Sequence, residues 1–419
     1  MIHIAFIILL FIIFLMRKSF SAYYFSPTGF LCVTWMVFVL LMLIFAQDYY
    51  FSVHSSFLIF LFITSFFLGE IFYHIISRRK VQKKDSINNT STFKKNFEWG
   101  LKVMGIVSLG GALLYMMVFA NYFGGITQLM GAGWAVRGAL IEGEIMVPFY
   151  VKLLLFPAYS NVVLVLAYYI LFVKFRWFLV LPFIALFIMG FVQVGRAGFM
   201  MILFQVYITV LFAIFYKNHQ AGTVVRHEIN LIKKSLLLVA VILVVFVGGD
   251  MLRKQDFTFD ISSIEIFRHY LFGGISAFDT FLNKREVSDI EYGLGKYTFS
   301  ALYDMLGISK NEFGVYLEYL RVSRKDPALN TNIYTAFRQF IDDFGIGGTL
   351  VCMFIFGMVS NHFYNQAVKG HIKAITVSIV LYTILFHSTM LSITVHNSIL
   401  LTLVMPNILL NLFTIKQKS

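Results

Sequence analysis

The sequence predicts an all-α polytopic membrane protein with about eleven transmembrane helices and one large helical segment on the outer face of the membrane. Apolar residues make up 59% of the 419 residues, and only 13% are charged. The mean hydropathy is +0.80. A water-soluble domain cannot keep so much apolar surface away from water. Long apolar runs recur along the chain, and basic residues gather in alternate loops, which is the pattern of repeated membrane crossing.

The apolar runs are the first of these signals. A helix needs about 20 mostly apolar residues to cross the hydrocarbon core. About eleven runs approach this length, at residues 2–16, 28–46, 55–76, 99–120, 149–172, 177–194, 199–216, 235–248, 345–364, 374–386 and 398–415. The first run is followed by its basic residues rather than preceded by them, so we interpret it as a retained span and not as a cleaved signal peptide.

The basic residues set the expected orientation. They lie mainly at positions 17–18, 78–95, 174–176, 217–234, 369–373 and 416–418, which all fall on one side if every run spans. Cytoplasmic loops carry the excess of Lys and Arg, so we expect the N-terminus outside and the C-terminus inside. This orientation accounts for the net charge of +13, and we expect no nucleic-acid partner.

The expected organisation has three parts. Residues 1–249 form eight transmembrane helices with short loops, residues 250–344 form the outer segment, and residues 345–419 form the last three helices. The outer segment holds 14 acidic and 11 basic residues. Apolar spacing at 264–271 and 313–320 predicts helices within it. The pairs Gly273-Gly274 and Gly293/Gly295 predict turns.

Arginines on the outer face are the first candidate functional residues. Orientation does not require them there, and guanidinium groups match the geometry of phosphate oxygens. Arg196 is the strongest, because it stands between two glycines at the mouth of a span, where a charge is costly. Arg137 and Arg253 are further candidates. The alternatives are snorkelling to lipid headgroups for Arg196 and surface ion pairs for the others.

A second candidate group directly precedes the span at 345–364. Helical spacing places Tyr334, Arg338 and Asp342 on one face, with Asp343 next to them. In the functional interpretation, Arg338 holds a phosphate and a carboxylate acts as a base. In the alternative, Arg338 and Asp342 are an ordinary ion pair one helical turn apart.

Histidines bracket the last outer turn. His387 and His396 are candidate proton acceptors near neutral pH, or else buried hydrogen-bonding residues. We find no motif for a metal or a nucleotide and expect neither metal nor cofactor. Cys32 and Cys352 both lie inside apolar runs and predict no disulfide framework.

The order of these features resembles the bacterial O-antigen polymerases, which are also called oligosaccharide repeat-unit polymerases. The residues that carry the resemblance extend over most of the chain from Trp99 onwards. In order, they are Trp134…Arg137…Glu142-Gly143, Gly195-Arg196-Ala197, the stretch 270–279, Asn332-Ile333-Tyr334-Thr335 and Asp343-Phe344-Gly345-Ile346-Gly347-Gly348.

The resemblance implies a membrane glycosyltransferase of the GT-C type in the bacterial inner membrane, with its active site facing the periplasm. Its substrates are undecaprenyl-diphosphate-linked oligosaccharides, and membrane lipids surround it. Arg196 and Arg338 fall where the family places arginines that bind the diphosphate. Arg137, Arg253, Asn332 and Tyr334 are expected to contact substrate. The base stays open among Asp342, Asp343, His387 and His396. A polysaccharide chain-length regulator is a candidate partner.

Two other functions remain open. O-antigen ligases are similar but carry a His-Asn pair where this chain has Thr331-Asn332, and this departure favours the polymerase. A flippase for lipid-linked sugars is the alternative from another class. Flippases place charges along a cavity within the membrane, whereas the charges here concentrate on one face.

Overall fold

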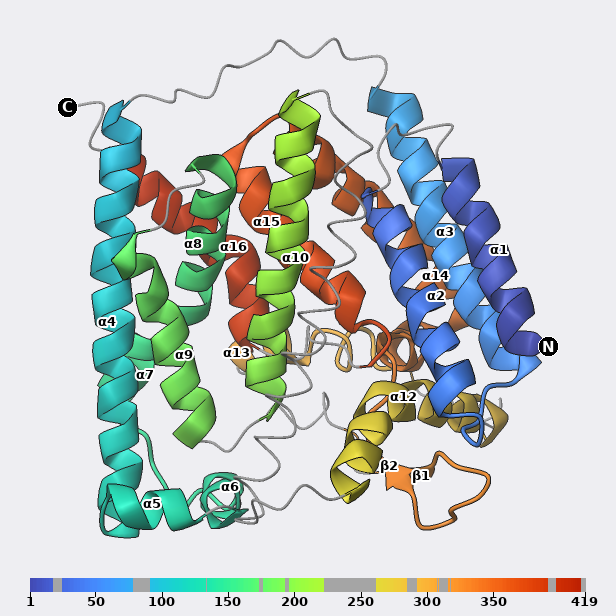
Figure 1. Ribbon diagram of the computed structural model, residues 1–419, viewed down its shortest axis with the longest axis horizontal. Helices are drawn as coiled ribbons and strands as arrows, with labels where there is room; N and C mark the ends of the chain where they lie inside the picture. Colours follow the sequence, from blue (N-terminus) through green and yellow to red (C-terminus); the bar gives the residue numbers. More distant parts are fainter. Residues whose placement is uncertain are drawn as a thin grey trace. The chain divides into compact units, whose positions relative to one another are not determined.

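The chain is an all-α membrane protein with almost no sheet (Figure 1). The computed structural model describes residues 1–17, 25–77, 91–132, 134–172, 176–192, 196–221, 261–284, 292–306, 308, 316, 318–390 and 397–415. These residues form two compact units. Unit 1 is Met1–Asp85, Arg268–Lys369 and Leu381–Leu400, and unit 2 is Ser86–Phe267, Gly370–Val380 and Leu401–Ser419. The predicted division into 1–249, 250–344 and 345–419 separates the transmembrane helices from the outer segment. It describes a different property from the two compact units, and it stays a prediction.

Unit 1 is built on four long helices that pack side by side (Figure 1). They are α1 (Ile2–Arg17), α2 (Pro27–Phe45), α3 (Val53–Ser77) and α14 (Ala336–Val368). The outer segment adds α12 (Ile261–Lys284), of which residues 268–284 belong to unit 1, α13 (Ser300–Met305), β1 (Leu320–Arg321) and β2 (Asn330–Thr331). The strands β1 and β2 pair antiparallel.

Unit 2 is built around the long helix α4 (Ser91–Phe123). The helices that contact it directly or through one another are α5 (Ile126–Ala132), α6 (Trp134–Ile141), α7 (Phe149–Leu155), α8 (Ala158–Phe172), η1 (Trp177–Val180), α9 (Leu181–Val192) and α10 (Arg196–Ala221). The helices α15 (Ile372–His387) and α16 (Asn397–Ile415) each contribute residues to both units. The stretch 121–147 is largely the helices α5 and α6.

The apolar helices match ten of the predicted runs. Five of them are long enough to cross a bilayer: Pro27–Phe45, Val53–Ser77, Phe93–Phe123, Phe149–Phe172 and Ala336–Val368. Five shorter apolar helices match the runs near 2–16, 177–194, 199–216, 374–386 and 398–415. The predicted span at 235–248 lies outside the described residues, so the count of eleven stays a prediction.

Close contact between α3 and α14 depends on glycine. A Cβ added at Gly69 would lie 2.0 Å from the backbone oxygen of Phe354, and one added at Gly357 would lie 2.0 Å from that of Phe66. A hydrogen bond also joins the two helices, since the hydroxyl of Ser65 in α3 donates to the backbone oxygen of Leu350 in α14 at 2.7 Å. Small residues that let helix backbones approach are a general means of association between membrane helices. The α3–α14 pair is therefore the tightest fixed contact in unit 1.

One end of unit 1 joins distant parts of the chain. The loop 46–52 between α2 and α3 contacts α12, since the backbone N–H of Tyr50 donates to Ser276 Oγ at 2.8 Å and that of Ser52 to Asp279 Oδ1 at 2.8 Å. The same loop contacts the β1–β2 region through Asp48, whose Oδ2 accepts from Ser323 Oγ at 2.7 Å. The loop 46–52 and the outer segment therefore lie at the same end of unit 1.

Two predictions for the outer segment are wrong. Gly273 and Gly274 do not form a turn but lie inside α12. A Cβ at Gly274 would lie 2.9 Å from the backbone oxygen of Met390, so this glycine permits close packing rather than a bend. Leu320, expected on a helical stripe, lies in strand β1. Gly295 does occupy a turn, with φ of 100°.

The α3–α14 contact generates a first prediction. Gly357→Ala should destabilise the protein by about 1–3 kcal/mol, because the added methyl group meets a backbone oxygen that cannot move without separating the helices. Thermal unfolding in detergent measures the effect. Gly347→Ala is the matched control in the same helix, since a Cβ there meets nothing within 4 Å. Equal unfolding temperatures for the two variants would contradict the account.

Candidate functional site

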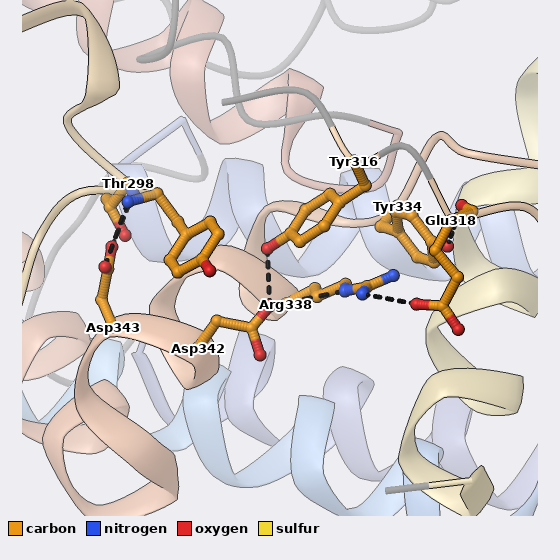
Figure 2. Close-up of polar contacts among 8 residues, drawn as sticks. Thr298, Tyr316, Glu318, Tyr334, Arg338, Asp342 and Asp343 are labelled. Carbon is orange, nitrogen blue, oxygen red and sulfur yellow. Dashed lines mark hydrogen bonds and ion pairs between the residues drawn. The ribbon is translucent and has the colours of Figure 1, made fainter. Parts of the chain in front are cut away.

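The candidate site centres on Arg338, near the start of α14. Its side chain is only 7% exposed. The guanidinium carbon lies 3.8 Å from the ring centroids of both Tyr316 and Tyr334 (Figure 2). It lies 4.4 Å from the ring centroid of Phe281. Cations are attracted to aromatic faces at these distances. Three rings thus hold the guanidinium plane in place.

Two carboxylates complete the surroundings of the guanidinium. Arg338 Nη2 donates to Glu318 Oε2 at 2.9 Å, and Nε lies 3.4 Å from Asp342 Oδ2 (Figure 2). The hydroxyl of Tyr316 donates to the same Asp342 oxygen at 2.6 Å. Arg338 Nη1 is buried and has no hydrogen-bond partner among the described residues. We call Arg338, Glu318, Asp342, Tyr316, Tyr334 and Phe281 the Arg338 cluster.

The structure brings Asn332 and Tyr334 to the same place, where they position other members of the cluster. Asn332 Nδ2 donates to the backbone oxygen of Tyr316 at 3.1 Å. The hydroxyl of Tyr334 donates to the backbone oxygen of Glu318 at 2.8 Å. Burial raises the pKa of the Tyr316 hydroxyl far above its ordinary value, and burial raises that of Tyr334 to about 12. Both phenols therefore stay protonated donors at neutral pH.

A break in α14 shapes the local backbone. Helical geometry runs from Ala336 but is interrupted at Gly345, where φ is 66° and ψ is −178°. A left-handed φ favours glycine. The short helical stretch before the break places Arg338 and Asp342 one turn apart on one face. Gly345 then redirects the chain into the long apolar part of α14.

Asp343 faces away from Arg338 and holds a turn. Its fully buried carboxylate accepts the backbone N–H groups of Tyr297 and Thr298, at 3.1 and 2.6 Å (Figure 2). The backbone oxygens of Asp342 and Asp343 accept the N–H groups of Gly293 and Leu294, at 3.0 and 3.3 Å. These bonds satisfy carbonyls that the helix break leaves without helical partners. Asp343 thus positions the turn, and the partly exposed Asp342 is the more accessible carboxylate.

His387 lies at the end of α15 in the same unit. It is buried, and its Nδ1 donates to the backbone oxygen of Thr383 at 2.8 Å. The next residue, Ser388, accepts the N–H of Ala336 at 3.1 Å, which ties this turn to the start of α14. The geometry favours the buried hydrogen-bonding interpretation of His387.

The remaining predicted residues are described only in part or not at all. Arg196 is the first residue of α10, and Arg137 lies within α6, but the side chains of both lie outside what the structure describes. Arg253 and His396 lie outside the described residues. Their proposed roles stay predictions.

Sequence reasoning missed three members of the Arg338 cluster. Tyr316, Glu318 and Phe281 lie 20 or more residues from Arg338 along the chain, and no periodic pattern connects them with it. Only folding of α12 and of the stretch around 316–318 onto α14 brings them together. Among the described residues, no group of three or more His, Cys, Asp or Glu side chains is placed to hold a metal ion.

One carboxylate of the Arg338 cluster is much more exposed than the other. One arginine faces two carboxylates, and of these Glu318 has a side chain that is 53% exposed. The ion pair of an exposed carboxylate contributes little free energy, because water solvates the carboxylate almost as well when the side chain rotates away from its partner. Its departure frees Nη2 beside Nη1, and these two donors form an edge suited to a phosphate group.

Comparisons with protein-family models, with curated proteins and with solved structures found no match for this chain.

A pH prediction follows from His269 of α12, next to the strand that leads to Asn332. Burial, and secondarily the charge of Arg268, lowers the pKa of its imidazole below the ordinary 6.5. The unfolded chain therefore binds this proton more readily than the folded one. The stability contribution of a neutral His269 is present above about pH 6.5 and is lost as the pH falls below it.

The measurement is the unfolding temperature between pH 5 and 8, in wild type and in His269→Gln. Glutamine does not titrate, so the advantage of the wild type should shrink on acidification. A difference between the two proteins that does not depend on pH would contradict the assignment to His269.

Proposed function

We propose that this protein is an O-antigen polymerase, a GT-C-type glycosyltransferase of the bacterial inner membrane. The single observation that carries the proposal is the Arg338 cluster: a buried arginine at the outer end of a transmembrane helix, with an exposed counter-anion. Orientation rules disfavour arginine in this position, and burial of its charge is costly. An anionic substrate that binds to the guanidinium would explain why Arg338 stands at this position despite these costs. The motif resemblance supplies the identity of that anion, the diphosphate of a lipid-linked oligosaccharide.

The proposed reaction transfers a growing glycan between two undecaprenyl-diphosphate-linked chains. A hydroxyl oxygen of the acceptor repeat unit bonds to the anomeric carbon of the donor glycan. The bond from that carbon to the diphosphate oxygen breaks, and the diphosphate departs with the electron pair. The hydroxyl proton passes to a carboxylate base. Cationic donors around the leaving diphosphate stabilise the charge that develops on it.

The proposed roles follow from the contacts. Arg338 binds the diphosphate after Glu318 moves away, and the three aromatic rings keep its guanidinium oriented in the meantime. Asp342 is the proposed base, because it is the more accessible of the two adjacent carboxylates and is held by Tyr316 and Arg338. Arg196 is proposed as a second arginine for the diphosphate on the grounds of the resemblance alone.

The proposed location of the reaction is the periplasmic face. The loop 46–52 and the outer segment lie at one end of unit 1, and the charge distribution puts that end outside. The proposed partners are the two lipid-linked oligosaccharides and the surrounding lipids. A chain-length regulator remains a candidate partner.

A flippase for lipid-linked sugars is the second candidate, and one observation favours it. Arg17 and Glu70 are fully buried in apolar helices of unit 1, with Ser26 Oγ donating to Glu70 Oε2 at 3.4 Å and His74 Nε2 lying 3.9 Å from Glu70 Oε1. Ionisable groups inside membrane helices commonly mark transport pathways. The O-antigen ligase remains the alternative within the same class of enzyme.

The test uses a cell that lacks its own O-antigen polymerase but keeps its ligase and flippase. The chain is expressed with its native repeat-unit genes, and extracted lipopolysaccharide is separated on a gel. Wild type should give a ladder of many repeat lengths. Arg338→Lys keeps the charge but loses the paired donor edge. It should reduce polymer by about 10²–10³-fold, the usual effect of removing a donor that stabilises developing negative charge.

Arg324→Ala is the matched control. Arg324 is an exposed arginine of the same segment, with its guanidinium 5.7 Å from the ring of Tyr50, and its loss should leave the ladder intact. Membrane levels of each variant are matched by immunoblot. A single-repeat band from wild type would overturn the polymerase and favour the ligase or flippase. An unchanged ladder from Arg338→Lys would remove Arg338 from the site.

A further inference from the structure

A stretch of the outer segment presents apolar side chains outwards. Between residues 292 and 308, six exposed side chains are aromatic or aliphatic: Tyr292, Leu294, Phe299, Leu302, Leu306 and Ile308. Leu294, Leu306 and Ile308 are 74%, 64% and 63% exposed. We call residues 292–308 the 292–308 segment.

The buried side of the 292–308 segment is more polar than its exposed side. Thr298 and Ser300 are almost completely buried, and the backbone around them is bound to the carboxylate of Asp343. Elements that face water have the opposite arrangement, with apolar residues inside and polar residues outside. An inverted pattern of this kind is expected where the surrounding solvent is lipid.

The β1–β2 hairpin of the same unit provides an internal contrast. Its exposed residues include Arg324, Lys325, Asp326 and Asn330. That surface has the composition expected for contact with water. The two parts of one outer segment therefore face different solvents.

The apolar face of the 292–308 segment continues onto α14. The ring of Tyr292 lies 3.0 Å from the position of a Cβ at Gly345, and the ring of Phe344 lies 3.8 Å from the corresponding position at Gly295. Directly after Gly345, the exposed side chains Ile346, Val351 and Ile355 follow one another along the membrane-spanning part of α14. The patch thus joins the exposed apolar side of a helix that is long and apolar enough to cross a membrane.

We propose that the 292–308 segment is embedded in the outer leaflet beside α14, with its exposed apolar side chains among lipid acyl chains. An isolated apolar patch of this size on a water-exposed domain marks an interaction surface. Continuity with the lipid-facing side of α14 identifies the occupant as bilayer lipid rather than another protein. Tyr292 and the exposed Lys296 suit the headgroup level, where aromatic and basic residues anchor membrane elements. This inference is independent of the proposed enzyme activity.

The test measures depth in the bilayer with spin labels on the full chain. Cys32→Ala and Cys352→Ala remove the native thiols, and single cysteines are then placed at Leu302 or Leu306. Ile355→Cys serves as the bilayer standard and Ala328→Cys, in the exposed hairpin, as the aqueous standard. The labelled protein is reconstituted in nanodiscs of phosphatidylethanolamine and phosphatidylglycerol. Collision rates with oxygen, which concentrates in lipid, and with a water-soluble nickel chelate are then compared.

The labels at 302 and 306 should give a ratio of oxygen to nickel collisions that is close to that at 355 and several-fold above that at 328. A ratio like that at 328 would place the segment in water and overturn the inference. Exclusion of both reagents would show that protein covers the patch, and it would also overturn the inference. If either cysteine variant fails to fold, labels at Leu294 and Ile308 test the same face.

Discussion

The structure of unit 1 depends on how the charge of Arg338 is accommodated near the N-terminal end of the long apolar helix α14. An unpaired guanidinium buried there would be strongly destabilising. Three aromatic rings and two carboxylates prevent this, and each comes from a part of the chain that must itself be positioned. Phe281 requires α12, Tyr334 and Asn332 require the strand β2 that precedes them, and Tyr316 and Glu318 are held by Asn332 and Tyr334. Parts of the outer segment that are distant in the sequence therefore meet at one side chain of α14.

The break at Gly345 links this cluster to the membrane. It separates the short helical stretch that carries Arg338 from the span itself, and it leaves backbone carbonyls that the 293–294 turn satisfies. Asp343 fixes the other side of that turn through two backbone N–H groups. Adjacent acidic residues thus have different tasks, because helical geometry points their side chains in different directions. Below the break, Gly69 and Gly357 hold α3 against α14, so the cluster rests on a rigid pair of helices.

Much of the fold, but less of the site, could be predicted from the sequence. Long apolar runs specify membrane helices strongly, since lipid leaves few other structures for a backbone. Spacing also predicted correctly that Arg338 and Asp342 share one helical face and that Tyr334 lies beside Arg338, but Tyr334 precedes α14, which begins at Ala336. It could not reveal Tyr316, Glu318 or Phe281, because their approach is set by tertiary packing alone. The Gly273-Gly274 prediction failed for a related reason: glycine signals either a bend or a close approach, and only the position of Met390 decides between them. For His387 the sequence left two interpretations open, a proton acceptor or a buried hydrogen-bonding residue, and its bond to Thr383 favours the second.

We propose that Glu318 binds Arg338 until a diphosphate replaces it. The most direct measurement is the affinity of purified protein in nanodiscs for undecaprenyl diphosphate, in wild type and in Glu318→Gln. Removal of the competing charge should tighten binding by about tenfold, which corresponds to about 1.4 kcal/mol. Asp326→Asn, which neutralises an exposed acid in the hairpin, should leave the affinity unchanged and so exclude a general charge effect. Equal affinities in wild type and Glu318→Gln would contradict the exchange, and with it the assignment of Arg338 as the residue that binds the diphosphate.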